Sequence, residues 1–169
     1  MRENGVEIRT MGRCVVPSPF NVSYAVEEGT GVLLDATVTS ERGPCSDPVV
    51  LEAAGPRRRI FFEPAHTRAA IVTCGGLCPG LNDVTRGITM VLWHRYGVRQ
   101  ILGFRYGYAG LNPDSGHAPR TLDPEAVHEI HNLGGTILGS GRGPQEVEVI
   151  VDTLERLEVD VLYTIGGDG

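Results

Sequence analysis

The sequence predicts an α/β fold with a mostly parallel sheet, and two observations point to it. From about residue 69, short apolar runs alternate with segments of helical periodicity, which is the pattern of βαβ units. Three glycine-rich loops, at residues 73–82, 138–144 and 166–169, each follow a run that is predicted to be a strand. Ligands of parallel sheets bind beyond the carboxyl ends of the strands, so we expect the functional site at these loops.

The bulk composition limits the classes of function. The chain has 169 residues, of which 41% are hydrophobic and 21% are charged, as is typical of a soluble globular domain. A formal net charge of −6 argues against nucleic-acid binding, which needs a basic face. The chain contains no lysine, and all of its lysine-or-arginine residues are arginine. A phosphate would therefore be held by guanidinium groups or by backbone N–H groups.

The sequence gives no indication of a membrane or secreted location. No apolar run is long enough to span a membrane, and the first twenty residues lack the apolar core of a secretory signal. The four cysteines include the pair Cys74 and Cys78, whose C-x3-C spacing does not match the usual zinc pairs. We therefore expect reduced thiols in a cytoplasmic protein.

Residues 1–65 are predicted to form an N-terminal extension that contains a few strands. The clearest strand signal is GVLLDATVTS at residues 31–40, with turn-rich sequences on both sides of it. The basic cluster at residues 57–59 is interpreted as a solvated turn. Residues 66–169 are predicted to form the α/β domain.

The first half of this domain is predicted to be a strand, a helix and a second strand. Residues 69–76 form an apolar run that ends in glycines. The helix has Asn82 as its N-cap and Gly97 near its end. Its periodicity predicts one apolar face, made of Val84, Ile88, Val91 and Leu92. The second strand is expected at residues 98–107.

The second half continues the alternation. Residues 123–134 predict a helix that is capped by Asp123. Residues 136–143 are expected to form a brief strand followed by a glycine loop. The next helix, at residues 144–159, has an apolar stripe formed by Val147, Ile150, Val151, Leu154 and Leu157. The last strand and its glycine loop occupy residues 160–169.

Each glycine loop supplies one component for binding phosphate groups. In the first, paired glycines precede a helix start, whose free N–H groups and dipole suit an anion; a tight turn without a ligand is the alternative. In the second, Arg142 can hold a phosphate through two hydrogen bonds, unless it is an ordinary surface arginine. In the third, Asp168 can hold a Mg²⁺ ion that bridges phosphate oxygens, unless it only forms an Asp turn. Together these components are typical of phosphoryl transfer.

Four stretches carry a resemblance to a known family. TCGGLCPGLNDVTRGI, GFRYGYAGL, ILGSGRGP and YTIGGDG resemble, in order and spacing, the motifs of the phosphofructokinase family. The sequence GGLCPGLN, preceded by IFFEP, resembles the plant-type and related bacterial branch of the family, which carries an N-terminal extension. The resemblance covers residues 60–169 and implies a three-layer sandwich with a mostly parallel sheet, incomplete in this chain.

The resemblance implies transfer of a phosphoryl group from ATP to the 1-hydroxyl of fructose 6-phosphate, which yields fructose 1,6-bisphosphate in glycolysis. By that resemblance, Gly76 approaches the nucleotide phosphates. Arg142 bridges the donor phosphates and stabilises the transferring group, with Gly143 beside it. Tyr108 is similar to a tyrosine near the donor.

The resemblance also assigns roles to the last three residues. Gly167 and Gly169 line the nucleotide site, and Asp168 binds Mg²⁺. Glycine at position 169 accompanies ATP in the family, whereas aspartate accompanies pyrophosphate. A carboxylate there would add negative charge where the α-phosphate must lie, so Gly169 favours ATP as the donor.

Some parts of the family pattern do not occur in these 169 residues. The Thr-Ile-Asp motif that supplies the general base is absent, and so are the sugar-phosphate arginines and histidine. We therefore expect an N-terminal portion that is inactive when isolated, whereas the complete enzyme is expected to be a homo-oligomer. A pyrophosphate-dependent phosphofructokinase, a non-catalytic nucleotide-binding fragment that pairs with full-length subunits, and a remnant that does not fold remain alternatives.

Overall fold

The structure of the chain is a computed structural model, and it describes residues 2–3, 6–7, 11–38 and 48–166. The contacts within the chain divide it into two units, Met1–Phe61 and Phe62–Gly169. Within the described ranges, none of the helices combines the length and the apolar character that crossing a bilayer requires.

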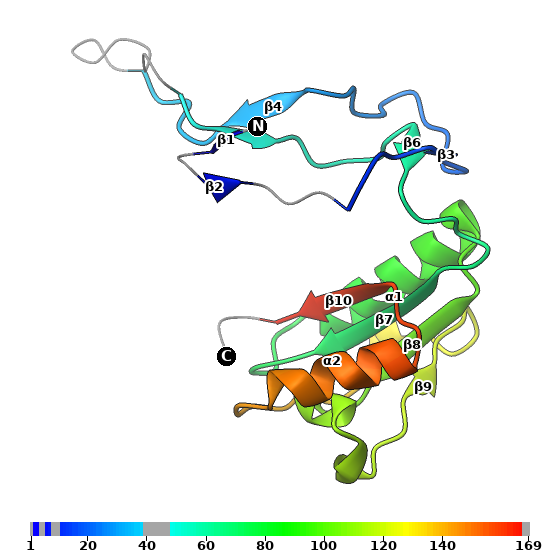
Figure 1. Cartoon of the computed structure of the whole chain (residues 1–169). Helices are drawn as coiled ribbons and strands as arrows, with labels where there is room; N and C mark the ends of the chain where they lie inside the picture. The colour runs from blue at the N-terminus through cyan, green and yellow to red at the C-terminus, as the bar shows by residue number, and fades with distance from the viewer. Residues whose placement is uncertain (1, 4–5, 8–10, 39–47, 167–169) are drawn as a thin grey trace. The chain divides into compact units, whose positions relative to one another are not determined.

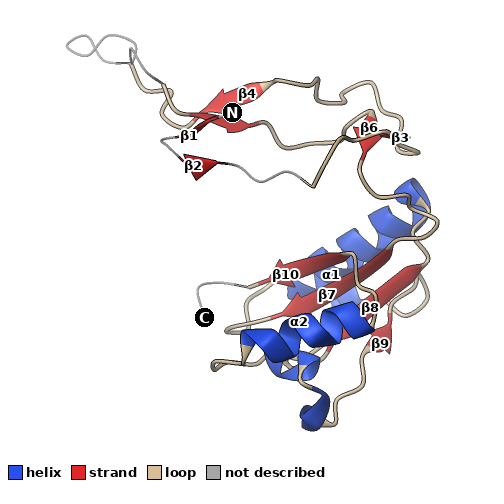
Figure 2. Cartoon of the chain, in the orientation of Figure 1, coloured by secondary structure: helices blue, strands red, loops and turns tan. Residues whose placement is uncertain are grey.

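The first unit contains short strands in antiparallel pairs (Figure 2). The strands are β1 (Arg2–Glu3) with β2 (Val6–Glu7), β3 (Val16–Pro17) with β6 (Arg59–Ile60), and β4 (Gly31–Leu33) with β5 (Val50–Glu52). The strand that was predicted at residues 31–40 is therefore three residues long, and residues 39–40 lie outside the described part.

One arginine of the basic cluster has a structural role that the sequence did not predict. Arg57 is not a freely solvated side chain, because its guanidinium donates hydrogen bonds to Glu27 O at 3.1 Å, to Glu52 Oε1 at 3.0 Å and to Ala53 O. These bonds tie the turn before β4 to the end of β5, so the interpretation of Arg57 as part of a solvated turn is wrong.

The second unit is built on a four-stranded sheet with the order β10-β7-β8-β9 (Figure 1). The strands are β7 (Arg68–Thr73), β8 (Gln100–Phe104), β9 (Arg120–Thr121) and β10 (Val161–Ile165). β7 pairs in parallel with both β8 and β10, and β9 is antiparallel to β8. The prediction of a mostly parallel sheet is confirmed.

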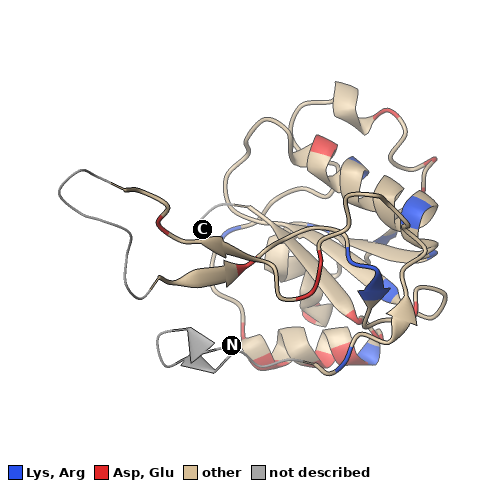
Figure 3. Ribbon diagram, turned by 90° about the horizontal axis from the view of Figure 1, so that it is seen from above, with Lys and Arg blue, Asp and Glu red and all other residues tan. Residues whose placement is uncertain are grey.

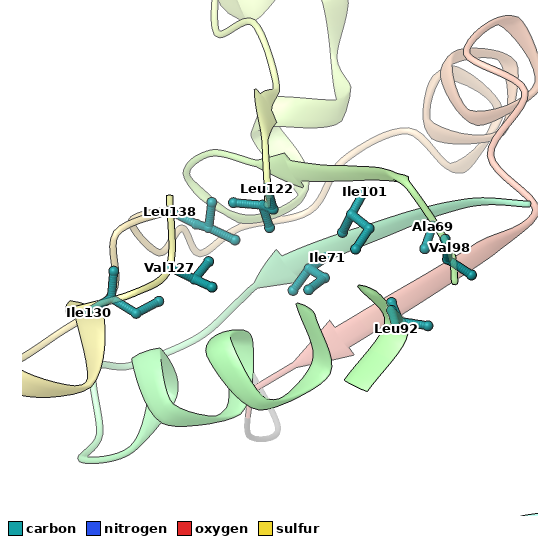
Figure 4. Close-up of a cluster of buried hydrophobic side chains, with 9 residues drawn as sticks. All are labelled: Ala69, Ile71, Leu92, Val98, Ile101, Leu122, Val127, Ile130 and Leu138. Carbon is teal, nitrogen blue, oxygen red and sulfur yellow. The ribbon is translucent and has the colours of Figure 1, made fainter. Parts of the chain in front are cut away.

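The sheet is covered on both faces, as a three-layer sandwich requires. Ala69 and Ile71 of β7 belong to one buried cluster, with Leu92 and Ile101 among its members (Figure 4). The alternate residues of β7 belong to a second cluster, against which apolar side chains of the last helix pack. This alternation places the helices α1 (Leu81–Val91) and α2 (Val147–Arg156) on opposite faces.

The buried face of α1 agrees only in part with the one that the sequence predicts, because Leu92 belongs to the first cluster and Ile88 packs against it, but the two valines do not. The helix buries Leu81, Asn82, Thr85 and Thr89, whereas Val84 and Val91 are 46% and 43% exposed. Threonine can be buried here because each hydroxyl donates to the carbonyl four residues earlier, at 2.9 Å for Thr85 and 2.8 Å for Thr89. The N-cap is Gly80 rather than Asn82, and a π-helical turn, Leu92–Tyr96, ends at Gly97 as expected.

Two other predicted elements are wrong, and the third helix is shorter than expected. Residues 123–134 contain only a 3-10 turn, Ile130–Asn132, although Asp123 does accept a hydrogen bond from Ala126 N at 2.7 Å. Residues 136–143 contain the expected glycine loop, but the brief strand that was predicted to precede the loop is absent from these residues. Of the predicted stripe on α2, Val147 and Val151 are exposed, whereas Ile150, Leu154 and Leu157 pack against the second cluster.

Candidate functional site

A groove of about 540 Å³ lies at the carboxyl ends of β7 and β8, where the parallel topology predicts a ligand site. Three segments form its walls: the loop after β7, Tyr106 after β8 and the loop that precedes α2. Its lining residues are Gly75, Leu77, Tyr106, Gly134, Gly135, Thr136, Gly139, Ser140, Gly141 and Arg142.

Hydrogen bonds hold the first and second glycine loops against each other. Gly75 N donates to Gly141 O at 3.1 Å, and Ser140 Oγ donates to Gly75 O. The hydroxyl of Thr73, at the end of β7, donates to Gly139 O at 2.6 Å. Two of the three loops that the sequence singled out are therefore neighbours in the fold.

Tyr106, the second residue after β8, fixes the second loop from the other side. Tyr106 N donates to Leu138 O at 2.8 Å. A Cβ atom on Gly141 would lie 2.3 Å from the carbonyl oxygen of Tyr106, so only glycine fits at this position. Gly139 has a φ of +67°, and a Cβ atom there would lie 2.7 Å from the Tyr106 ring.

Asn82 supports the third side of the groove. Its side chain is 3% exposed, donates from Nδ2 to Leu133 O at 2.9 Å and accepts from Ile137 N at 2.9 Å. These two partners flank residues 134–136, which line the groove. Sequence reasoning assigned Asn82 to a helix cap, because asparagine is common at helix starts. It missed the role of Asn82 in the groove, because the hydrogen-bond partners lie 51 and 55 residues away along the chain.

The structure brings together Arg142 and Gly76, two of the predicted site residues. A Cβ atom on Gly76 would lie 2.9 Å from Nη2 of Arg142. Arg142 is exposed, and no carboxylate of the described residues lies within 4.0 Å of its guanidinium. A guanidinium without an acidic partner beside a glycine turn can bind an anion such as a phosphate.

The other predicted site residues either do not line the groove or lie outside the described part of the chain. Gly143 follows Arg142 with a φ of +107° and open space around it. Tyr108 is half-buried, packs against the second cluster and does not line the groove, whereas Tyr106 does. Gly167, Asp168 and Gly169 lie outside the described residues. Their assigned roles, including Mg²⁺ binding by Asp168, stay predictions.

The described charges agree with a local anion site and not with a broad basic surface. Acidic and basic positions are mixed along the ribbons (Figure 3). Within the described ranges, no group of three or more histidine, cysteine or acidic side chains is arranged to hold a metal ion. Among the residues that line the groove, Arg142 carries a positive charge, and backbone N–H groups of the glycine loops can add to it.

Comparison with known proteins gives a family match and relatives that all carry the name phosphofructokinase. The sequence profile of the family named Phosphofructokinase matches residues 68–169. The chain is 44% identical over 170 residues to ATP-dependent 6-phosphofructokinase of Borreliella burgdorferi, an alignment that covers 96% of this chain and 38% of the relative. It is 47% identical over 175 residues to ATP-dependent 6-phosphofructokinase of Amycolatopsis methanolica, with 97% and 38% covered.

A solved structure agrees with these sequence matches. Pichia pastoris phosphofructokinase in the T-state superposes with a TM-score of 0.54 at 26% identity, over 76% of this chain and 14% of that chain. The chain spans about 38% of the length of the two curated relatives above. Because both alignments cover nearly all of this chain, they include the N-terminal unit as well as the α/β unit.

Proposed function

The chain belongs to the phosphofructokinase family, and from that premise we propose that it serves the transfer of a phosphoryl group from ATP to fructose 6-phosphate. The observation that carries the proposal is the placement of Arg142 beside Gly76 in a groove at the ends of two parallel strands. The names of the relatives support ATP as the donor.

In this proposal the two neighbouring glycine loops bind the donor phosphates. Backbone N–H groups near Gly76 approach the phosphate oxygens, which the absence of a side chain permits. The Arg142 guanidinium bridges the phosphates and stabilises the charge that develops on the transferring group. Gly143 leaves room beside it, since a Cβ atom there meets nothing within 4 Å.

The last three residues complete the donor side of the proposal. Asp168 binds Mg²⁺, with Gly167 and Gly169 along the nucleotide. The Mg²⁺ ion would offset the negative charge of the phosphates. The absence of a side chain at Gly169 favours ATP over pyrophosphate. Tyr108 is proposed to lie near the donor, as the resemblance implies.

The acceptor side of the reaction is proposed to depend on segments beyond these 169 residues. The chain spans 38% of its relatives, and the family's base-bearing motif does not occur in it. We therefore propose that these residues bind ATP without turnover when isolated. The complete enzyme is proposed to be a cytoplasmic homo-oligomer that acts in glycolysis.

Calorimetric titration of the purified chain with ATP and with pyrophosphate, each with Mg²⁺, tests the proposal. We expect tighter binding of ATP, and Arg142→Ala should weaken it about tenfold or more, because hydrogen bonds to charged groups are strong. Arg156→Ala, which removes an exposed arginine of α2, is the matched control and should bind ATP as the wild type does.

Three results would count against the proposal. Tighter binding of pyrophosphate would reverse the donor assignment. Equal ATP affinity of Arg142→Ala and Arg156→Ala would remove Arg142 from the site. Turnover of fructose 6-phosphate by the isolated chain in a coupled assay would contradict the proposed need for further segments, and would leave the donor assignment intact.

A further inference from the structure

The groove carries an aromatic side chain that the phosphate contacts do not use. We propose that Tyr106 is a specificity-determining residue that contacts the nucleobase of the donor, and thereby selects a nucleoside triphosphate over a bare polyphosphate. This inference rests on the proposed function, because it places the nucleobase of the same donor in the same groove, next to Tyr106. The juxtaposition of Tyr106 with Arg142 in one groove carries it.

The backbone of Tyr106 is held in an unusual conformation. Its φ and ψ are 63° and 43°, in the left-handed region that side-chain-bearing residues rarely adopt. The hydrogen bond from Tyr106 N to Leu138 O keeps it there, and its carbonyl oxygen packs against Gly141. Such conformations persist where the surrounding structure enforces them, and they gather at ligand sites.

Neighbouring side chains fix the orientation of the Tyr106 ring. Arg105 Nη2 donates to Tyr106 Oη at 2.9 Å, and the guanidinium carbon lies 5.0 Å from the ring centroid. The His117 ring lies 4.6 Å from the Tyr106 ring, centroid to centroid, at an angle of 56°. Despite these contacts Tyr106 is 38% exposed, so part of the side chain remains available to a ligand.

A nucleoside triphosphate matches this arrangement in its chemistry. Its phosphates carry negative charge, which suits Arg142 and the glycine loops, whereas its base is flat and aromatic, which suits a tyrosine ring. Stacking of a base on an aromatic side chain tolerates any base, because every base has a π-face. A polyphosphate offers only the charged part, so the ring would add affinity for the nucleotide alone.

The test compares ATP with inorganic tripolyphosphate, which has the same chain of phosphates without the nucleoside. Binding of each with Mg²⁺ is measured by calorimetry on the full chain. For Tyr106→Ala we expect about tenfold weaker ATP binding, the change that loss of one base–aromatic stack produces, and unchanged tripolyphosphate binding. Tyr106→Phe keeps the ring, so it should bind ATP within about twofold of the wild type.

Tyr24→Ala is the matched control, because Tyr24 is 67% exposed and belongs to the other unit. It should leave both affinities unchanged. Equal weakening of ATP and tripolyphosphate in Tyr106→Ala would make the ring a support of the loop and would overturn the inference. So would a wild type that binds the two equally. A wild type that binds neither would overturn the phosphate groove itself, and with it the proposed function.

Discussion

Asn82 shows at the scale of one residue how the groove depends on a buried amide. Its two hydrogen bonds reach Leu133 and Ile137, on either side of the groove-lining residues 134–136. Without the amide, the N–H of Ile137 and the C=O of Leu133 would lose their partner. A buried group left without a hydrogen bond costs about 1–3 kcal/mol.

We therefore expect Asn82→Ala to lower the free energy of unfolding by about 1–3 kcal/mol, measured by urea denaturation, because Leu133 is exposed and can bond to water instead, whereas Ile137 is half-buried. Asn132→Ala is the control, because the Asn132 side chain is exposed and bonds only to Glu129 within its own turn. That change should cost less than about 0.5 kcal/mol. If the two variants were equally stable, the two hydrogen bonds of Asn82 would contribute nothing to the fold.

The sequence identifies some site residues and misses others for a physical reason. Gly76 and Arg142 belong to glycine loops, whose composition is a local signal. Asn82 and Tyr106 act through partners that are distant in sequence: those of Asn82 are 51 and 55 residues away, and Tyr106 bonds to Leu138. No local pattern encodes such contacts, so only the fold shows them.

At the scale of the element, α1 shows where periodicity misleads. Its valines suggest a buried face, yet Thr85 and Thr89 are fully buried and Val84 is 46% exposed. Hydrophobicity ranks threonine as polar, but in a helix its hydroxyl can donate to the preceding turn and leave a methyl group for the core. The helix was predictable, as was the packing of Ile88 and Leu92, but the burial of Thr85 and Thr89 was not.

A pair of neighbouring substitutions distinguishes the two faces of α1. Thr85→Asp should lower the free energy of unfolding by more than about 3 kcal/mol, because it buries a carboxylate without a partner. Val84→Asp should change it by less than about 0.5 kcal/mol, since the position is exposed and lies in the first turn, where negative charge is favourable. Chemical denaturation of both variants measures the difference. A larger loss of stability in Val84→Asp than in Thr85→Asp would show that Val84, as the sequence predicts, lies on the buried face of α1.

The loop at residues 136–143 shows a second limit at this scale. Its apolar start resembles a strand, but its carbonyl groups accept hydrogen bonds from two segments: Leu138 from Tyr106 N after β8, and Gly139 and Gly141 from the Thr73 hydroxyl and Gly75 N at the end of β7. Neighbouring strands would bond to each other through their backbone N–H groups, whereas Gly139 here has a φ of +67° and accepts from a side-chain hydroxyl. The sequence therefore located a loop whose residues 139–142 line the groove, while the backbone conformation of that loop depended on the surrounding elements.

At the scale of the whole molecule, alternation of strand and helix was enough to predict the layers of the second unit. Parallel strands need a crossover, and helical crossovers cover the faces of the sheet. The order β10-β7-β8-β9 was not predictable, because it depends on the side on which the last strand joins. The short antiparallel β9 was missed as well, since two residues carry no periodicity.

The two core clusters also determine how the stability of the folded protein responds to alkaline pH. Burial raises the pKa of the Cys74 thiol above its ordinary value of 9.0. Burial, and secondarily the charge of Tyr96, raises the pKa of Tyr163 above its ordinary value of 10.0. In both cases the unfolded chain releases its proton at lower pH than the folded protein does. Above these ordinary values the unfolded state therefore binds fewer protons, and stability falls as pH rises.

We expect the free energy of unfolding to stay level as the pH rises to about 8.5 and to fall above it, first as unfolded Cys74 ionises and then as unfolded Tyr163 does. Urea denaturation with a reductant present, repeated at intervals up to pH 10.5, measures this. Cys74→Ala should remove the part of the decline that begins near the ordinary thiol pKa, and Tyr163→Phe the part that begins about one pH unit higher. Tyr24→Phe, at an exposed tyrosine, should leave the profile unchanged. A stability that rises above pH 9, or a decline that neither core variant alters, would show that these two buried groups do not control the alkaline limit of the fold.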